Sequence, residues 1–291
     1  MSEQVIRFWE QAADQYRAEA YRFAQRGSRY PFYEARLALM VDMIEHLPKG
    51  KMLDAGCGGA LMLLHFLDGG WDVVGIDGAQ NMVAVAHENL AGRQQDCARV
   101  RLGNVTDLSG FADGEFDVVI SAGVMEYLTE DEAAQAFAQA RRVLKPSGHF
   151  LVENINGLFD VMTFNRFTVR FYEERVLPLF FPDSDKRAEL TDRIRGLLTN
   201  PDKPDKSGAY TTTRDQVFTR AEIPLTFAEK AAGLGFRQLE QGFYRFHAVP
   251  PLMFPEEPSL EKVTIDQELP LSRHWIGNLM ATSFVALLQK T

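Results

Sequence analysis

A glycine-rich turn between two apolar segments constrains this chain more than any other feature of its sequence. Residues 52–60 read Met-Leu-Asp-Ala-Gly-Cys-Gly-Gly-Ala, and the apolar residues 73–76 follow and end at Asp77. Gly56 and Gly58 let the backbone pass close to a ligand, where a Cβ atom would collide. Asp77 comes about 20 residues after the turn, the spacing that places an acid on a ribose diol in nucleotide-binding βαβ units. The segment is therefore predicted to bind an adenosine-type cofactor.

The residues around the turn discriminate between cofactors of that type. A dinucleotide site favours Gly-x-Gly-x-x-Gly/Ala, whereas Leu61 occupies the third glycine position here. Asp54, two residues before the turn, would repel a pyrophosphate and favour an ammonium group. The run from Asp54 to Gly59 resembles the first motif of class I S-adenosylmethionine-dependent methyltransferases. S-adenosylmethionine carries a sulfonium and an ammonium and no phosphate, so the resemblance implies S-adenosylmethionine as the cofactor.

Strand-like and helix-like segments alternate up to residue 153, which predicts an α/β fold with a doubly wound, mostly parallel sheet. The turn Leu144-Lys-Pro-Ser-Gly148 before a strand also resembles the methyltransferase family. The resemblance implies a Rossmann-like sheet of seven strands in the order 3-2-1-4-5-7-6, ending in an antiparallel hairpin. The expected strands cover 51–55, 71–76, 99–102, 116–121, 149–153, 236–247 and 279–288, and the expected helices cover 3–25, 33–47, 61–67, 80–90, 131–144 and 224–234.

The chain is predicted to have three parts. Residues 1–48 form an N-terminal helical cap, and residues 49–153 together with 223–291 form the Rossmann-like cofactor domain. Residues 154–222 lack the alternation, are rich in aromatic residues and include the polar loop 200–205. Because this stretch follows the fifth strand, on the side where parallel sheets bind ligands, we expect a helical lid insertion over the substrate.

The resemblance also indicates which positions contact the cofactor. Asp77 is expected to accept hydrogen bonds from both ribose hydroxyls, and Asp54 to favour the methionine ammonium directly or through water. Met82 is expected beside the adenine ring or in a helix core, and the Val105 amide near a ring nitrogen. Asn104 stands where family members usually carry an aspartate, and its carbonyl oxygen can still accept from the adenine amino group. The predicted cofactor-binding residues are Tyr16, Asp54, Gly56, Gly58, Asp77, Gly78, Met82, Asn104, Val105 and Ser121.

Methyl transfer requires a nucleophile aligned with the S–CH3 bond and the exclusion of water. A general base is needed only when the acceptor arrives protonated. The candidate catalytic residues are Asn154 after the fifth strand, Tyr172 in the lid and His247 at the end of the sixth strand. Tyr16 in the first helix is a further candidate for the base, and each of the four could instead serve packing. No Asn-Pro-Pro-Tyr-type motif follows the fourth strand, which argues against methylation of DNA bases or protein glutamine. No His-x-x-Glu-x-His constellation is present, so no metal is predicted.

Net charge and cysteine content limit the kinds of partner and the cellular compartment that the sequence predicts. The formal net charge of −9 argues against a nucleic-acid partner. Cys57 and Cys97 are the only cysteines, too few for a disulfide framework or a zinc site. The sequence shows neither a basic-then-apolar signal peptide nor a run of 18 apolar residues. We therefore expect a cytoplasmic protein that acts on a small molecule and does not cross a membrane.

Three functions fit these observations. The first is a methyltransferase acting on an oxygen, nitrogen or carbon atom of a small molecule, as in specialised metabolism. The second is an enzyme that consumes S-adenosylmethionine without methylating, by attack of the cofactor's own amine to form azetidine-2-carboxylate. The aromatic residues of the lid and of the N-terminal segment, such as Tyr16, are compatible with that chemistry. The third is a non-catalytic cofactor-binding protein, and a tRNA-modifying role is disfavoured by the acidic balance.

Overall fold

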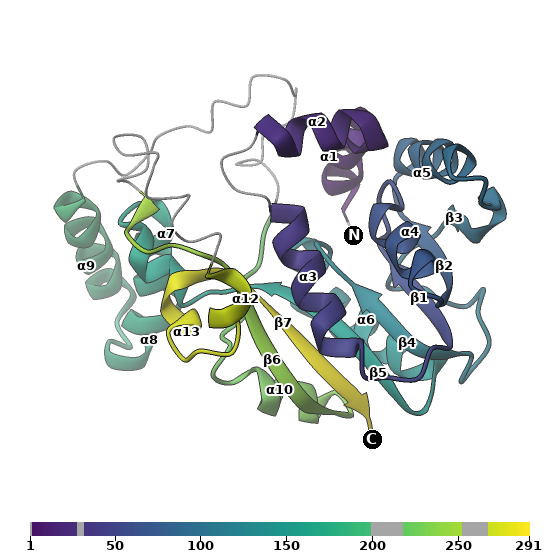
Figure 1. Ribbon diagram of the computed structural model, residues 1–291. Helices are drawn as coiled ribbons and strands as arrows, with labels where there is room; N and C mark the ends of the chain where they lie inside the picture. Colours follow the sequence, from purple (N-terminus) through teal and green to yellow (C-terminus); the bar gives the residue numbers. More distant parts are fainter. Residues whose placement is uncertain (1, 28–31, 199–217, 252–266) are drawn as a thin grey trace.

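The computed structural model of this chain describes residues 2–27, 32–198, 218–251 and 267–291. One seven-stranded sheet crosses the molecule in the order β3-β2-β1-β4-β5-β7-β6, which confirms the predicted fold (Figure 1). The strands are β1 (Lys51–Ala55), β2 (Asp72–Asp77), β3 (Val100–Leu102), β4 (Phe116–Ser121), β5 (Leu144–Ile155), β6 (Phe236–Phe246) and β7 (Ala281–Lys290). The α-helices are α1 (Glu3–Ala12), α2 (Ala18–Gly27), α3 (Phe32–Ile44), α4 (Leu61–Asp68), α5 (Gln80–Gly92), α6 (Glu130–Val143), α7 (Arg166–Phe171), α8 (Leu177–Phe180), α9 (Ser184–Leu197), α10 (Phe227–Gly233), α12 (Glu268–Leu271) and α13 (Gly277–Met280).

The pairing of the strands places a crevice at the middle of the sheet. Leu53 of β1 lies opposite Val74 of β2 on one side and Val119 of β4 on the other, with all three strands parallel. Strand β7 runs antiparallel between β5 and β6, with Leu287 opposite Leu151. The strand order reverses between β1 and β4, and the crevice outside the carboxyl ends at such a reversal is where open α/β sheets bind ligands.

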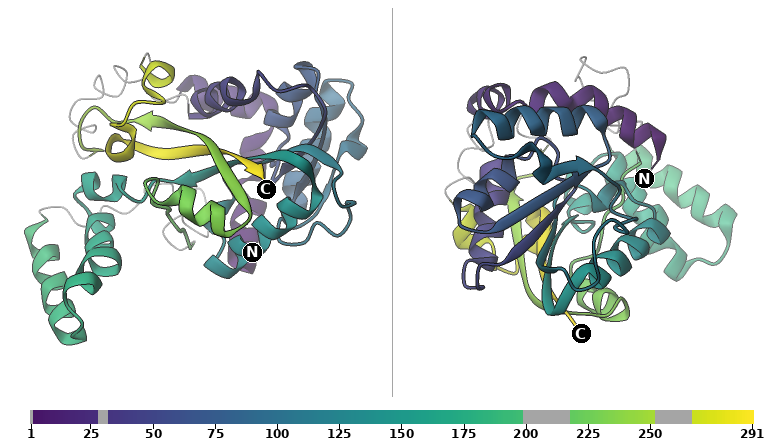
Figure 2. Two further views of the ribbon diagram at one scale, coloured as in Figure 1. Left: turned by 90° about the horizontal axis from the view of Figure 1, so that it is seen from below. Right: turned by 90° about the vertical axis from the view of Figure 1, so that its right-hand side faces the viewer.

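Apolar side chains cover both faces of the sheet. One core lies between the sheet, α6 and α10 and includes Phe137 and Phe236. The other lies against α3, α4 and α5 and includes Leu39 and Leu63. Each fully buried side chain of this size contributes roughly 1.5–3 kcal/mol, so the sheet is anchored from both sides. The two views of Figure 2 show helices on both faces of the twisted sheet.

The N-terminal segment differs from the single helix expected over residues 3–25. Helix α1 passes into a short 3-10 helix over Ala13–Tyr16, and Arg17 adopts an extended ψ of 132° before α2 begins. Long-range bonds cause the break, because the Asn89 side chain of α5 accepts from the Ala18 amide at 2.9 Å and donates to the Tyr16 carbonyl at 2.9 Å. The carboxylate of Glu10 also accepts from the amides that begin α5. Helix α1, the 3-10 turn and the start of α2 are therefore docked on α5.

Strand β5 is longer than predicted. It begins at Leu144, which pairs with Phe116, so the turn expected over residues 145–148 is an irregularity within the strand. Ser147 takes up the distortion with a φ of +60°. The short helices α12 and α13 were not expected, because their four-residue lengths carry no periodic signal.

The segment after β5 is mainly helical up to residue 198. It contains α7, a π-helical turn over Tyr172–Val176, α8 and α9. The polar loop 200–205 lies outside the described residues. Figures 1 and 2 place α8 and α9 beyond the β6 and β7 side of the molecule, far from α4 and α5. None of the helices in the described part of the chain is long and apolar enough to cross a membrane.

Candidate active site

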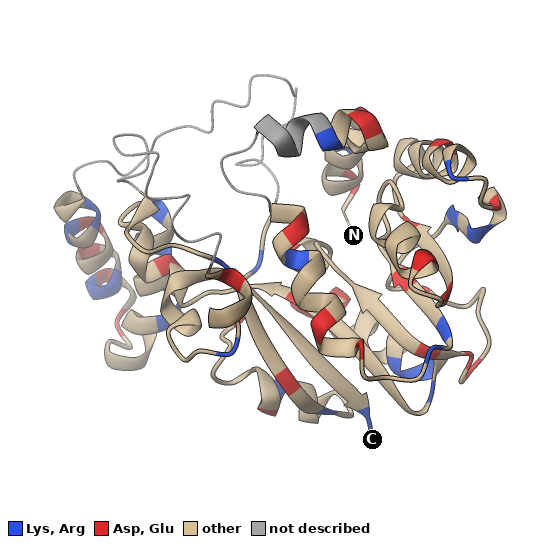
Figure 3. Ribbon diagram, in the orientation of Figure 1, with Lys and Arg blue, Asp and Glu red and all other residues tan. Residues whose placement is uncertain are grey.

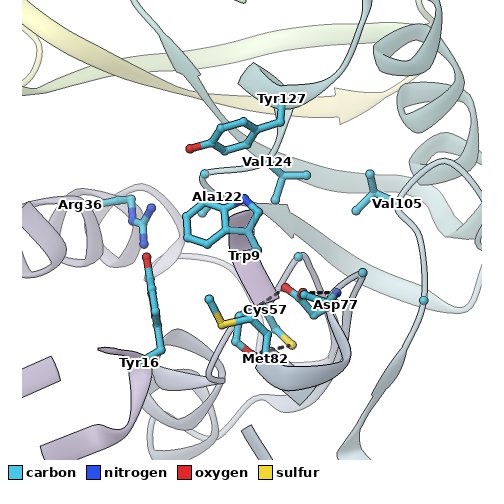
Figure 4. A pocket seen from close by; sticks show the side chains of 16 residues that line it. Trp9, Tyr16, Arg36, Cys57, Asp77, Met82, Val105, Ala122, Val124 and Tyr127 are labelled. Atoms are coloured by element: carbon cyan, nitrogen blue, oxygen red, sulfur yellow. Dashed lines mark hydrogen bonds between the residues drawn. The ribbon is translucent and has the colours of Figure 1, made fainter. Parts of the chain in front are cut away.

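A cavity lies at the carboxyl ends of β1, β2 and β4, where the strand order reverses (Figure 4). The glycine loop and the end of β2 form one side, the loop after β4 forms a second, and the N-terminal helices close a third. The residues that line it are Trp9, Tyr16, Arg36, Gly56, Cys57, Gly58, Asp77, Gly78, Ala79, Met82, Gly103, Val105, Ala122, Gly123, Val124 and Tyr127.

The glycine loop has a conformation that requires glycine. Gly56 has a φ of +95°, and a Cβ atom there would lie 2.2 Å from Cγ2 of Val124. Gly58 has a φ of +51°. The amides of Gly56 and Cys57 both donate to the Ile76 carbonyl, at 2.8 and 2.9 Å, and so join the loop to the end of β2. These bonds bring the loop backbone and Asp77 to the same wall of the cavity.

Asp77 is held by two backbone amides. Its Oδ2 accepts from the Gly58 amide and its Oδ1 from the Ala79 amide, each at 2.9 Å, and both bonds are drawn in Figure 4. Burial raises the pKa of Asp77, and the bonds from Ala79 and Gly58 oppose this rise. A carboxylate has about four lone-pair sites, so each oxygen can still accept from a ligand hydroxyl in the cavity.

A buried acid and a partly buried guanidinium lie at or beside the cavity. Asp54 is 3% exposed, and its Oδ2 has no hydrogen-bond partner among the described residues. Burial raises the pKa of Asp54 to about 7, although the Arg36 guanidinium lowers it. Arg36 lines the cavity and donates through Nη1 to Oε2 of Glu153 at 3.1 Å. The Nε of Arg36 is also buried without a partner in the described part of the chain. Unpaired buried polar atoms are costly, so these two indicate a polar ligand or ordered water.

Aromatic rings form the opposite wall of the cavity. Trp9 packs edge-on against Tyr16, with ring centroids 5.9 Å apart, and against Tyr127 at 5.6 Å. Tyr16 also contacts Tyr21, at 5.4 Å between centroids. Figure 4 shows Trp9 across the cavity from Asp77, with Arg36 and Tyr16 together at one end. Such faces favour a cation by about 0.5–2 kcal/mol per contact.

The structure brings together seven of the predicted cofactor-binding residues. Those that line the cavity are Tyr16, Gly56, Gly58, Asp77, Gly78, Met82 and Val105. Asp54 and Ser121 are buried beneath it, and Asn104 uses its Oδ1 to accept from the Thr106 amide at 3.1 Å. Sequence reasoning placed Ala122 at the floor of the pocket, and it did not assign Trp9, Arg36, Cys57, Ala79, Gly103, Gly123, Val124 and Tyr127 to the cofactor site.

Of the four candidate catalytic residues, Tyr16 lines the cavity and Asn154, Tyr172 and His247 do not. Asn154 is 2% exposed within β5, and its Nδ2 finds no partner in the described structure. Tyr172 lies in the π-helical turn and contacts the Phe171 ring. The ring of His247 contacts that of Phe159, at 4.8 Å between centroids and tilted by 50°, and burial lowers the pKa of His247 to about 4. These three residues therefore lie apart from the cofactor-side cavity.

Side chains that could hold a metal ion do not cluster in the described ranges. No group of three or more His, Cys, Asp or Glu residues with suitable placement occurs there. The two cysteines are not paired with each other: Cys57 is buried in the glycine loop and Cys97 is half-buried.

Comparison with known proteins agrees with this site. The family described as "Methyltransferase domain" matches residues 53–152. The YqeM protein of Bacillus subtilis is 32% identical over 115 residues, which cover 39% of this chain and 45% of that protein. A ubiquinone biosynthesis O-methyltransferase of Acinetobacter baylyi is 29% identical over 106 residues, covering 36% of this chain and 44% of that protein. The chain thus spans less than half the length of these curated relatives.

Solved structures share the fold at low sequence identity. The PH0226 protein of Pyrococcus horikoshii OT3 is similar over 96% of this chain and 95% of its own, with a TM-score of 0.55 and 19% identity. An S-adenosylmethionine-dependent methyltransferase of Mesorhizobium loti covers 88% of this chain and 98% of its own, with a TM-score of 0.50 and 13% identity. The family match contains the glycine loop, Asp77 and Val105. Residues 53–152 therefore match the methyltransferase domain family, and the fold is shared with a solved S-adenosylmethionine-dependent methyltransferase.

Proposed function

We propose that this protein transfers the methyl group of S-adenosylmethionine to a small-molecule acceptor. The observation that carries the proposal is the position of Asp77. Its carboxylate is fixed by the Gly58 and Ala79 amides and borders a cavity that the glycine loop also lines. A ribose diol is the group that such a carboxylate binds in this class of site.

Residues in and beside the cavity complement the other parts of the cofactor. The unpaired Oδ2 of Asp54 lies beneath the glycine loop and complements an ammonium group. Arg36 presents its guanidinium to the cavity and complements a carboxylate. Trp9 and Tyr127 offer ring faces and edges to a sulfonium. The cofactor's zwitterionic amino-acid end and its sulfonium therefore each have a chemical counterpart.

The protein's own contribution to the reaction is binding, orientation and exclusion of water. S-adenosylmethionine, when bound, supplies an electrophilic methyl group on a positively charged sulfur. The rings of Trp9, Tyr16 and Tyr127 cover the cavity and would exclude water from that centre. The carboxylate of Asp77 and the guanidinium of Arg36 lie on different walls, so together they restrain the ligand at two places.

Residues 154–222 are proposed to frame the acceptor. Of the described residues in this segment, none lines the cofactor cavity, so the segment is available for the second substrate. Its end is bound to the cavity wall, because the Arg220 amide donates to the Glu126 carbonyl at 2.7 Å and Arg220 Nε donates to the Leu128 carbonyl at 3.1 Å. Replacing Tyr172 by Phe or Asn154 by Ala is expected to lower turnover far more than cofactor affinity.

Charge supports a small acceptor over a nucleic acid. The chain has a formal net charge of −9, and acidic and basic side chains alternate along α9 (Figure 3). There Lys186 pairs with Glu189 and Arg195 with Asp192, each at 2.8 Å. A surface that binds a nucleic-acid backbone would instead need Lys and Arg side chains in a continuous row without interspersed acids. A Burkholderia thailandensis enzyme of this fold, with a TM-score of 0.50 and 16% identity, is an N1-methyltransferase that binds 1,6-didemethyltoxoflavin.

A second function is favoured by the aromatic wall and the buried acid together. If the cofactor's own amine attacked its γ carbon, the C–N bond would form as the C–S bond broke, and the products would be azetidine-2-carboxylate and methylthioadenosine. The amine must first lose a proton, and a buried carboxylate such as Asp54, with a pKa of about 7, is suited to accept it.

Mass spectrometry of the products distinguishes the two reactions. The protein is incubated with S-adenosylmethionine, alone and with pools of hydroxyl, amine and carbon acceptors. S-adenosylhomocysteine formed only with an acceptor supports methyl transfer, whereas methylthioadenosine formed without one supports cyclisation. Asp77→Asn should abolish most of either product, and Asp72→Asn, at the other end of β2, should not. Absence of S-adenosylhomocysteine binding in calorimetry would refute both functions.

A further inference from the structure

Three polar side chains from separate elements form a buried chain that ends at the cavity. Arg36 of α3 donates through Nη1 to Oε2 of Glu153 on β5 at 3.1 Å, and the hydroxyl of Tyr244 on β6 donates to the other oxygen, Oε1. Glu153 is 4% exposed and Tyr244 is 1% exposed. Only Arg36 of the three borders the cavity, so Glu153 and Tyr244 act on any ligand through it.

Stability alone does not account for this arrangement. A buried ion pair is often no more stable than apolar side chains of the same volume, because both charges lose their hydration. Burial also raises the pKa of Tyr244 well above its usual value, so its hydroxyl keeps its proton and remains a donor. Both oxygens of Glu153 are thereby bonded, and the carboxylate is fixed in one orientation.

The guanidinium is fixed on its remaining sides by rings. Arg36 lies 5.1 Å from the Phe32 ring centroid and 5.9 Å from that of Tyr33. Its Nη1 is bonded to Glu153, whereas its Nε has no partner within the described ranges. Arg36 therefore has donors left over, on a group that borders the cavity.

We infer that Glu153 and Tyr244 are positioning residues, which hold the Arg36 guanidinium so that its remaining donors bind the cofactor's carboxylate. The inference rests on the proposed function, because it takes the amino-acid end of the cofactor to lie at Arg36. A guanidinium binds a carboxylate strongly only when its planar donors are aligned with both oxygens. Loss of alignment should therefore lower the affinity for ligands that carry the carboxylate and leave the affinity for ligands without it unchanged.

Two variants test alignment without changing the charge of the cluster. Tyr244→Phe removes one oxygen and releases Oε1 of Glu153. Glu153→Asp keeps the charge but shortens the side chain by one methylene, which withdraws it from Arg36. Tyr33→Phe is the matched control, because its hydroxyl is buried beside Arg36 and has no partner in the described structure. Circular dichroism and thermal unfolding establish that each variant is folded.

Calorimetry with two ligands gives the readout. The probes are S-adenosylhomocysteine and S-adenosyl-3-thiopropylamine, which is the same molecule without its carboxylate. The wild type is expected to prefer the first by about ten- to a hundredfold, the effect of a hydrogen-bonded charge. Tyr244→Phe and Glu153→Asp should each lower this ratio at least threefold and leave the affinity for the amine probe within twofold. Tyr33→Phe should keep the wild-type ratio.

The outcomes separate this inference from the proposed function. A wild type that binds neither probe refutes the function. A wild type that discriminates, with both variants keeping its ratio, overturns the positioning role alone. Equal weakening of both probes in the variants also overturns it, because that pattern reports general disruption of the fold. Since Tyr244→Phe removes a single oxygen, it provides the test even if Glu153→Asp does not fold.

Discussion

Replacing Asp77 with asparagine tests the cofactor site at the residue that carries the functional proposal. The change keeps the size and shape of the side chain and replaces one oxygen by an NH2 group. In the structure the two oxygens accept from the Gly58 and Ala79 amides, each at 2.9 Å. An asparagine can accept only one of these bonds, and its NH2 group then faces a backbone N–H.

The geometry sets the expected magnitudes. A carboxylate that accepts from ribose hydroxyls loses about 1.5–3 kcal/mol of binding when its charge is removed, or roughly ten- to 150-fold in Kd. An unpaired buried amide costs about 1–3 kcal/mol of folding free energy. Burial raises the pKa of Asp77, however, so the neutral asparagine avoids part of the cost of burying a charge. We therefore expect a stability loss of only about 1 kcal/mol and a larger loss in binding.

Calorimetry with S-adenosylhomocysteine and its 2′-deoxy analogue measures the effect and its origin. If Asp77 binds the ribose, the substitution should lower the affinity for the intact ligand more than that for the deoxy analogue, since the analogue already lacks one hydrogen bond to Asp77. Asp72→Asn is the matched control, because Asp72 lies on the same strand, is exposed and pairs with Arg99 at 2.9 Å. Equal losses for the two ligands, or an unchanged Kd in a folded variant, would show that Asp77 does not bind the ribose.

Three further predictions concern titration and packing. Burial raises the pKa of Asp54 from 3.8 to about 7, so its contribution to the stability of the ligand-free protein is present below pH 4 and should be lost as the pH rises from 4 to 7. The affinity for S-adenosylhomocysteine should instead increase as Asp54 ionises, and it should be about tenfold higher at pH 8 than at pH 6. Asp54→Asn should flatten the pH profile, and calorimetry in buffers of different ionisation enthalpy should show proton release with the wild type only. Asn89→Ala should lower the free energy of unfolding in urea by roughly 3 kcal/mol, because Asn89 bonds to the Tyr16 and Gly59 carbonyls and to the amide that begins α2. A loss under about 1 kcal/mol would contradict its role in holding the N-terminal helices on α5. Burial lowers the pKa of His247 to about 4, so this residue should stabilise the fold above pH 6.5 and lose that effect as pH falls toward 4, and His247→Phe should remove this part of the acid sensitivity in thermal melts.

The cofactor half of the molecule was predictable because its signals are local. Strands β1 and β4 have the predicted bounds, and the carboxylate of Asp77 lies on the cavity wall with the glycine loop. Each of these features depends on residues close together in sequence: a strand of apolar residues, a turn that needs positive φ and an acid at the end of the next strand. The strand order followed from the family resemblance, and the pairing of β7 with β5 and β6 confirms it.

The other half of the cavity depends on contacts between distant residues. Trp9 reads as one member of an apolar helical stripe, and only the docking of α1 on α5 turns it toward the cavity. Tyr127 lies in a three-residue 3-10 helix, which has no sequence signature. Side chains alternate across a strand, so adjacent residues face opposite ways. Asn154 was the predicted residue, whereas its neighbour Glu153 is the one bonded to the Arg36 that lines the cavity.

If the cofactor binds as proposed, the unpaired polar atoms beside the cavity would favour a whole cofactor over its nucleoside part. Asp54 and Arg36 each leave a buried polar atom unpaired among the described residues, which raises the free energy of the ligand-free protein. A ligand that brings both an ammonium and a carboxylate can pair both atoms at once. Adenosine, which carries neither, would leave this cost in place and gain only the bonds at Asp77. Selectivity for an amino-acid end would thus arise from the unpaired polar atoms of the protein as much as from the contacts that the ligand adds.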